Sequence, residues 1–272
     1  MAWYIFSKAV KALFAGVLGA VAFGGGSAIA ENTIIPDESL GLEESSIVQP
    51  FREDVDFILG GARRDDNLFH SFEQFDIGEQ NGAYFAFPAG FIQNVFARVT
   101  GDDVSEIFGV LGTLEFFGNQ FFQSNADLYF INPNGVIFGD DSALAVGGSF
   151  SVTTAENLIF ENEGVFSTST PNSPSNLLSV DPSAYLFDST SVGDITSRSV
   201  RQGVDRMGAI TGLSVLPGNN ITLIGRDINI LGDEENTSSL VASGGDVIIG
   251  ATSGEGKVSV DNTEGLVFSS NL

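Results

Sequence analysis

Basic residues, histidine and cysteine are scarce or missing in this sequence of 272 residues, which has 11 Lys and Arg against 35 Asp and Glu. The absence of cysteine excludes disulfides, thiolate metal sites and thiol chemistry, so packing and backbone pairing must stabilise the fold. The formal net charge of −24 argues against binding to nucleic-acid phosphates and to anionic membrane surfaces. Such an acidic surface favours solubility, and we interpret it as solvated rather than as a collector of cations.

Recognisable catalytic arrangements are missing as well. His70 is the only histidine, and no serine or cysteine motif accompanies it, so we interpret it as a structural residue rather than a general base. Acidic doublets such as Asp102-Asp103 lie in expected turns, and on a strand their side chains would point to opposite faces. The sequence therefore indicates no enzyme, no cofactor and no metal site.

Long apolar runs are absent after the first part of the chain. Two lysines precede an apolar run from Ala12 to Phe23, and Ala28-Ile29-Ala30 matches an A-x-A cleavage pattern. The run is shorter than the ~20 residues that a membrane-spanning helix needs. We therefore expect residues 1–30 to be a Sec signal peptide and residues 31–272 to form one domain. That domain ends in strand-like sequence without a capping signal, so we expect it to continue or to be truncated at the C-terminus.

Glycine and phenylalanine are abundant, with 33 and 24 residues, and they punctuate or occupy short apolar segments. From Phe91 onward such segments predict a series of short strands, and no helical period persists beyond a few turns. The spacing from Leu128 to Phe150 indicates coils of roughly twenty residues, within the range of solenoid repeats. The phenylalanines are expected to form ladders of stacked rings inside these coils.

Two segments depart from the regular pattern. Residues 31–64 alternate short apolar runs with acidic loops, and we expect them to cap one end of the solenoid. Residues 167–206 are rich in Ser, Thr, Pro and Asp, but Leu177-Leu178 and Tyr185-Leu186-Phe187 interrupt them. We expect a long excursion that still attaches apolar side chains to the body.

The stretch from Asp127 to Gly139 joins two apolar strands at the corner Asn132-Pro133-Asn134-Gly135, which is followed by Val136. Proline fixes φ near −65°, and asparagine and glycine tolerate positive φ. The side chain of Asn132 can bond to nearby backbone, as in an Asx-turn. The sequence therefore predicts a sharp corner of a coiled sheet at this point.

The corner also carries a family resemblance. Asn132-Pro133-Asn134-Gly135-Val136 resembles the Asn-Pro-Asn-Gly-Ile motif of two-partner secretion domains, which are the N-terminal domains of filamentous-haemagglutinin-like exoproteins. Upstream, Asn67-Leu68-Phe69-His70-Ser71-Phe72 resembles the Asn-Leu-Phe-His-Ser-Phe block of one branch, and Val99-Thr100-Gly101 resembles the connecting segment. The second motif of haemagglutinin-type members, Asn-Pro-Asn-Leu, is absent, so no role of that motif is carried over.

The resemblance implies an all-β fold, a single-stranded right-handed parallel β-helix of the pectin-lyase type with an N-terminal cap and extra-helical hairpins. It implies a secretion domain that the periplasmic modules of a TpsB-type outer-membrane β-barrel transporter recognise, and that folds at the cell surface or in the medium. The two motifs above would then serve transporter recognition or folding. An adhesive role, with a ligand on a host or neighbouring cell, is a further implication of the resemblance.

Two other classes remain open at this stage. A structural surface-layer or matrix protein could share the β-helix. A pectate-lyase-like enzyme could share it too, but would need carboxylates grouped with an Arg or Lys base, and the few basic residues show no such grouping.

Overall fold

The computed structural model describes residues 31–161, 164–188, 191–200, 202–205, 208–232, 238–261 and 265–269. The predicted signal peptide, residues 1–30, lies outside the described residues. Within the described ranges nearly every element is a strand, and the one helical turn is the 3₁₀ helix η1 (Asn176–Ser179). None of the helical structure described there is long and apolar enough to cross a membrane.

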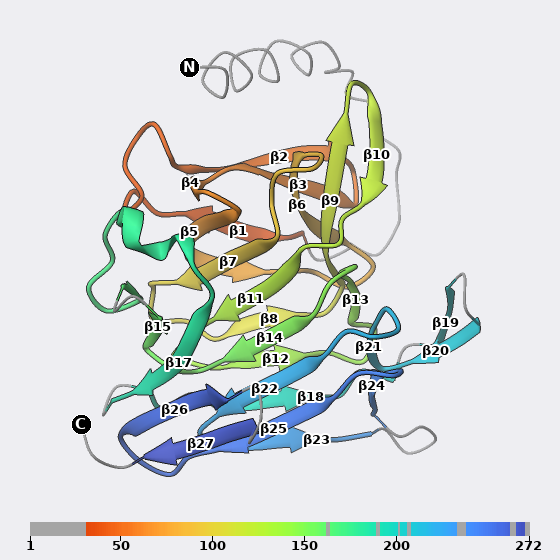
Figure 1. Ribbon diagram of the computed structural model, residues 1–272. Coiled ribbons are helices and arrows are strands. Elements are labelled where there is room, and N and C mark those ends of the chain that lie inside the picture. The colour runs from red at the N-terminus through yellow and green to blue at the C-terminus, as the bar shows by residue number, and fades with distance from the viewer. Residues whose placement is uncertain are drawn as a thin grey trace.

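Three parallel sheets form the body (Figure 1). Sheet A consists of β5 (Asn67–Asp76), β7 (Asn94–Val99), β11 (Asp127–Ile131), β14 (Phe150–Thr153), β22 (Ile221–Gly225) and β25 (Val247–Ala251). Sheet B consists of β3 (Val55–Gly60), β6 (Gly82–Pro88), β9 (Val110–Phe117) and β13 (Ala143–Ala145). Sheet C consists of β8 (Ser105–Ile107), β12 (Val136–Phe138), β18 (Ile195–Ser197) and β23 (Ile228–Ile230).

The chain visits the sheets in a fixed order, from A to C to B and back to A, as in β7, β8, β9 and β11. The parallel pair β21 (Leu213–Val215) and β24 (Leu240–Ala242) occupies the sheet B position in the later coils, with β21 in contact with β13. Each coil is thus hydrogen-bonded to the next, and the predicted β-helix is confirmed. Leu128 pairs directly with Phe150, so the spacing that predicted the coil length joins neighbouring coils.

Antiparallel strands close the first end of the body. We call residues 31–64 the N-terminal cap. β1 (Thr33–Pro36) and β4 (Ala62–Arg64) pair antiparallel with the outer edge of β5, and β2 (Ser46–Arg52) pairs antiparallel with β3. An open parallel edge would expose a row of unpaired backbone groups. The cap therefore satisfies the edges of sheets A and B.

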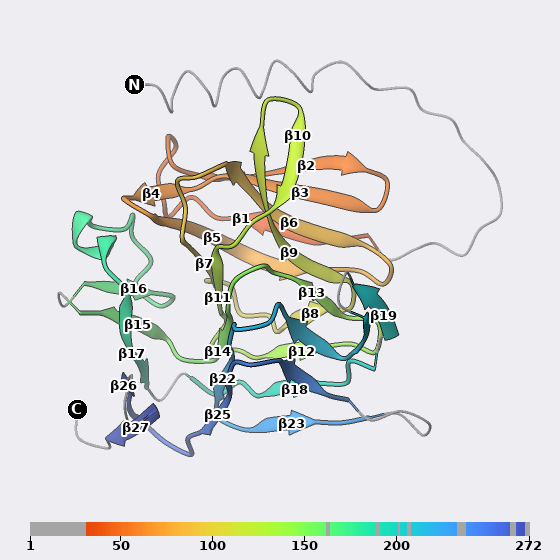
Figure 2. The same cartoon turned by 45° about the vertical axis from the view of Figure 1, so that its right-hand side comes forward.

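Three excursions leave the coils. The hairpin of β9 with β10 (Gln120–Gln123) and the hairpin of β19 (Gln202–Asp205) with β20 (Gly208–Thr211) are antiparallel. A separate antiparallel sheet, here the side sheet, lies beside sheet A (Figure 2). It is ordered β16 (Val165–Ser167), β15 (Asn157–Phe160), β17 (Pro182–Phe187), β26 (Gly256–Asp261) and β27 (Gly265–Ser269).

Apolar side chains form one core inside the coils and a second between sheet A and the side sheet. The expected attachment of the excursion is confirmed, since Leu178, Tyr185 and Phe187 are buried in the second core. The longest stack of rings among the described residues also lies there. Phe69 stacks on Phe96 at 4.9 Å and Phe96 on Tyr129 at 4.7 Å between ring centroids.

The prediction of stacked rings inside the coils is thus right only in part, since Phe75 and Phe85 stack there at 6.1 Å between ring centroids. Inside, several ring pairs meet edge to face, with 74° between Phe72 and Phe75 and 66° between Phe75 and Phe130. Successive coils differ in length and in residue type at the inner positions, so interior rings fill space at varied angles. On the outer face of sheet A, by contrast, Phe69, Phe96 and Tyr129 are paired across adjacent strands, so their rings stack on one another.

Candidate functional site

The corner at 132–135 turns the chain from sheet A to sheet C. The backbone N–H of Gly135 donates to the carbonyl of Asn132 at 3.1 Å, which closes a tight turn. The Asn134 N–H donates to the side-chain oxygen of Asn132 at 3.0 Å, so the expected Asx-turn is present. Gly135 has φ of 123°, whereas Asn134 is not among the described residues with positive φ. Glycine is thus required at one position of the corner, and asparagine serves through its side chain.

Neighbouring coils hold the corner from both sides. The side-chain amide of Asn132, which is buried, donates to the Asp103 carbonyl at 3.0 Å and to the Ser105 hydroxyl at 2.9 Å in the preceding coil. On the other side, the Gly193 N–H donates to the Pro133 carbonyl at 2.9 Å. The corner is consequently an internal layer of the stack, and only Asn134 among 132–136 retains partial exposure.

The block 67–72 forms the start of β5, and its alternation divides it between two cores. Leu68 and Phe72 face the interior of the coils, whereas Phe69 faces the side sheet. All six residues of the block are buried. The block thus serves both cores at once, and because both faces are buried, its polar residues Asn67, His70 and Ser71 do not alternate with the apolar ones.

His70 is fully enclosed. Its Nδ1 lies 3.0 Å from the Ser46 hydroxyl, and Nε2 has no hydrogen-bond partner among the described residues. A side chain at Gly61 would approach the imidazole Cε1 to 2.8 Å, so a glycine has to cover this ring. Burial lowers the pKa of His70 to about 3, and the ring is neutral at ordinary pH. This environment agrees with the structural interpretation.

Asn67 connects the first coil with the excursion. Its amide nitrogen donates to the carbonyls of Leu178 at 2.8 Å and Val180 at 2.9 Å. Its side-chain oxygen accepts from Asn94 at 2.9 Å in the next coil. Both N–H groups and the oxygen of this buried amide therefore form hydrogen bonds, and their partners lie far apart in the sequence.

Ser71 lies in a buried polar cluster that the sequence did not reveal. Its hydroxyl donates to the carboxylate of Asp37 at 2.7 Å and accepts from Nε of Arg98 at 2.8 Å. Arg98 is 1 % exposed, and its guanidinium also binds the Ser39 hydroxyl and two backbone carbonyls. The cluster joins the N-terminal cap, β5 and β7.

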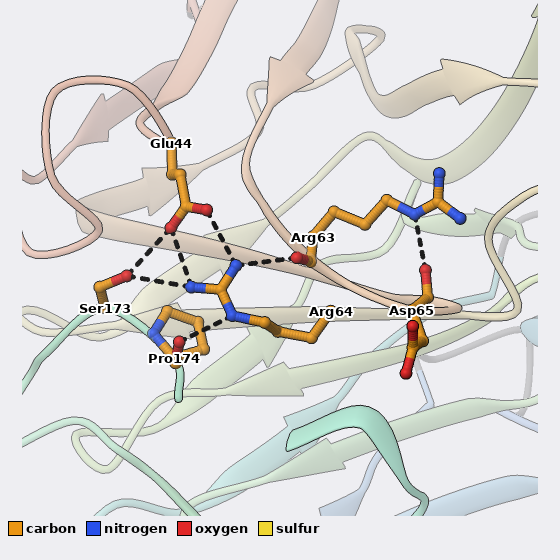
Figure 3. Close-up of polar contacts among 6 residues, drawn as sticks. All are labelled: Glu44, Arg63, Arg64, Asp65, Ser173 and Pro174. Atoms are coloured by element: carbon orange, nitrogen blue, oxygen red, sulfur yellow. Dashed lines mark hydrogen bonds and ion pairs between the residues drawn. The ribbon is translucent and has the colours of Figure 1, made fainter. Parts of the chain in front are cut away.

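A second arginine makes a similar link nearer the surface (Figure 3). Two guanidinium nitrogens of Arg64 bind the two carboxylate oxygens of Glu44 at 2.8 and 3.0 Å, and Nε donates to the Pro174 carbonyl at 2.8 Å. Ser173 donates to the same carboxylate at 3.0 Å. Hydrogen bonds from Arg64 and Ser173 outweigh burial and lower the pKa of Glu44, with the Arg64 bond contributing most.

The three blocks that carry the resemblance lie in one stack. The Thr100 N–H donates to the Phe72 carbonyl at 2.8 Å, and the Asn134 amide donates to the Gly101 carbonyl at 2.7 Å. The three segments thus lie on successive strands of sheet A, with the block 67–72 in β5, the connecting segment at the end of β7 and the corner directly after β11. No group of three or more His, Cys, Asp or Glu that could hold a metal occurs in the part of the chain that the structure describes.

Comparison with known proteins gives one family and one structural relative of note. The model of the TPS secretion domain matches residues 32–271. The crystal structure of the HMW1 secretion domain from Haemophilus influenzae is similar at a TM-score of 0.53 and 16% sequence identity, over 90% of this chain and 50% of that chain. This chain thus spans about half the length of that structure. No curated protein matches.

Proposed function

The chain belongs to the TPS secretion domain family, whose model matches residues 32–271, and on this premise we propose how it is exported. It is a secretion domain of a two-partner exoprotein, and such domains pass through the periplasm to the cell surface or the medium with a TpsB-type outer-membrane transporter. We propose that the periplasmic modules of the cognate transporter bind this chain before it folds, and that the chain folds after it emerges.

Burial of the motif residues is the observation that carries the proposal. Asn132, His70 and Ser71 are each 0 % exposed, and the rest of both motifs is buried except for part of Asn134. A partner that reads these side chains meets them only in an unfolded chain. In the folded domain the same residues hold successive coils together, so one sequence serves recognition first and folding afterwards.

Strand-forming segments suit both steps. An extended chain can add a strand to an exposed sheet edge of a transporter module, which gives binding through backbone hydrogen bonds. Once outside, each completed coil offers an edge to the next, about 4.8 Å along the axis. Folding on the far side of the membrane prevents back-sliding and gives the export its direction.

Co-expression in a two-membrane host tests the proposal. With its cognate transporter the mature chain should appear in the medium, and without it the chain should stay in the periplasm and be degraded. Gly135→Val should lower the yield, whereas Gly254→Val, at a glycine with open space around it and no positive φ, should not. Efficient release without any transporter would contradict the two-partner assignment.

Binding of the unfolded chain to the isolated periplasmic modules separates the two roles of the corner. A Gly135→Val chain that binds the modules like the parent chain would place the role of the corner in folding. Weaker binding would place it in recognition. For the leader, sequencing the N-terminus of secreted material should show Glu31 first, and a retained apolar segment would contradict cleavage after Ala30.

An adhesive role is the finer proposal, with a ligand on a host or neighbouring cell surface. A transporter gene beside this one would favour the exoprotein over a structural matrix protein. We also propose that the domain is not an enzyme, because a TPS secretion domain is a non-catalytic module. Incubation with polygalacturonate and Ca²⁺ checks the β-helical lyase alternative, and cleavage of the polymer would overturn this part of the proposal.

A further inference from the structure

The segment 164–180, here called the strap, crosses from the side sheet to the N-terminal end of the body. Donors from the first two coils of sheet A and from the cap bind five of its backbone carbonyls, at 2.8 to 3.0 Å. These carbonyls belong to Ser167, Asn172, Pro174, Leu178 and Val180. The donors are Arg64, Asn67 and Arg98, so the path of the strap is set by side chains that precede it by 69 to 113 residues.

Arg98 is the centre of this arrangement. One guanidinium nitrogen donates to the Ser167 carbonyl at 2.8 Å, and another donates to the Asn172 carbonyl at 3.0 Å. The guanidinium carbon also lies 4.2 Å from the centre of the Phe166 ring. The strap thus supplies two acceptors and an aromatic face to an arginine that is 1 % exposed.

The cap supplies the other side of the same guanidinium. Ser39 accepts from it at 2.8 Å and donates to the Asp37 carboxylate at 2.6 Å. Burial alone would raise the pKa of Asp37, but hydrogen bonds from Ser39, Thr100 and Ser71 outweigh it and lower that pKa. Burial lowers the pKa of Arg98 to about 10, with Asp37 opposing the shift, so both groups are charged at neutral pH.

A buried guanidinium without acceptors is strongly unfavourable, since its desolvation is not compensated. If the strap were absent, Arg98 would lose two acceptors. If the cap were absent, it would lose Ser39 and the nearby charge of Asp37. We infer that the strap and the N-terminal cap close as one cooperative unit around Arg98, so that the first end of the β-helix is completed only when residues up to 180 have docked.

This coupling is a property of the folded chain and does not depend on the transporter. It assigns to Arg98 a positioning role and to the strap the role of a closing segment. For a chain that emerges gradually, the cap would remain open while coils that need only their neighbours already form. The N-terminal cap would then close only after more than half of the domain has emerged.

Hydrogen exchange of the full mature chain tests the coupling. Arg98→Lys keeps the positive charge but cannot reach acceptors on both sides, because an ammonium is a point donor on a flexible stem. We expect protection of cap and strap amides to fall together by about tenfold or more, while β22 and β25 keep theirs. Arg226→Lys is the matched control, because Arg226 also binds two carbonyls, those of Ser191 and Ser253, but in the later coils.

Two outcomes would overturn the inference. A strap that exchanges rapidly beside a fully protected cap would show that the two close independently. An equal loss of protection in every coil would show that Arg98 supports general stability only.

A change confined to the cap gives the reciprocal test. Ser39→Ala removes an Arg98 acceptor without touching the strap, and a small cavity at this partly exposed site should leave the chain folded. The strap amides should nevertheless lose protection, together with the cap. Asp37→Asn should act in the same direction. Unchanged strap protection in Ser39→Ala would contradict the coupling even if Arg98→Lys failed to fold.

Discussion

The first coil and the last coil described differ in how their inner side chains are covered. At the first end, antiparallel strands and the Arg98 cluster close the body, and Phe72 is fully buried. In the last coil described, Val247 and Ile249 are 43% and 48% exposed, although they pair with Ile221 and Leu223, which are 0% exposed. The paired residues occupy the same positions on adjacent strands of sheet A. They differ in that β22 has a strand on both sides, whereas β25 has one on only one side among the described residues. Burial in this fold is therefore conferred by the next layer of chain, as in other repeat structures.

The largest effect should come from removing a buried ring at the closed first end of the body. Phe72→Ala removes a fully buried ring that contacts Phe75 and Phe85, and should cost about 3–5 kcal/mol of the free energy of unfolding. Urea denaturation of a chain of residues 31–272 measures this loss. A loss below about 1 kcal/mol would mean that the closed first end is packed no better than the last coil described.

The next effect concerns the backbone of the middle coils. Gly135→Val should cost about 1–3 kcal/mol, because φ of 123° is strained for valine. A Cβ there would also lie 3.0 Å from the Asp194 carbonyl oxygen of the following coil. Gly218→Val is the matched control before β22, with positive φ but no atom within 4 Å of the Cβ. If the two variants shift the denaturation midpoint equally, backbone strain alone explains the loss, and the contact with Asp194 contributes nothing.

Acid should act on the closed end. Burial lowers the pKa of His70 in the folded chain to about 3, below its ordinary value of 6.5. Above pH 6.5 the ring is neutral in both the folded and the unfolded chain, so burial of the ring costs no deprotonation energy there. As pH falls from 6.5 toward 3, the unfolded chain takes up the proton first, and stability should drop by about 1.4 kcal/mol per pH unit. His70→Gln should flatten the stability profile between pH 6.5 and 4. A variant as acid-sensitive as the parent would assign the effect to the carboxylates.

The smallest effect is expected in the last coil described. Ile249→Ala should cost less than about 1 kcal/mol, because about half of this residue is already exposed to solvent. Leu223→Ala, at the paired position one coil earlier, should cost about 2–5 kcal/mol. Equal costs for the two in parallel denaturation experiments would contradict the view that the next layer confers burial.

Much of the local structure could be predicted from the sequence. The corner at 132–135 depends on proline, asparagine and glycine in fixed order, and the Asx-turn and positive φ appear where those residues allow them. The spacing from Leu128 to Phe150 identified one pair of neighbouring coils, whereas other coils are longer, as the pairings of Asn94 with Asp127 and of Ile221 with Val247 show. Such features are encoded within a few residues or one repeat, so composition and spacing are sufficient to find them.

The tertiary structure decided which partners meet across long stretches of chain. The sequence showed that Phe69 and Phe96 are apolar, but only the side sheet made the outer face of sheet A a second core. Arg98 reaches carbonyls 69 and 74 residues away, and Asn67 reaches others more than a hundred residues away. Because every residue carries a backbone carbonyl, the sequence cannot show which of these carbonyls accepts a hydrogen bond from a buried donor. The amino-acid pattern determined the strands, the corner and the acidic surface, whereas the choice of acceptors for the buried donors was made by the path of the folded chain.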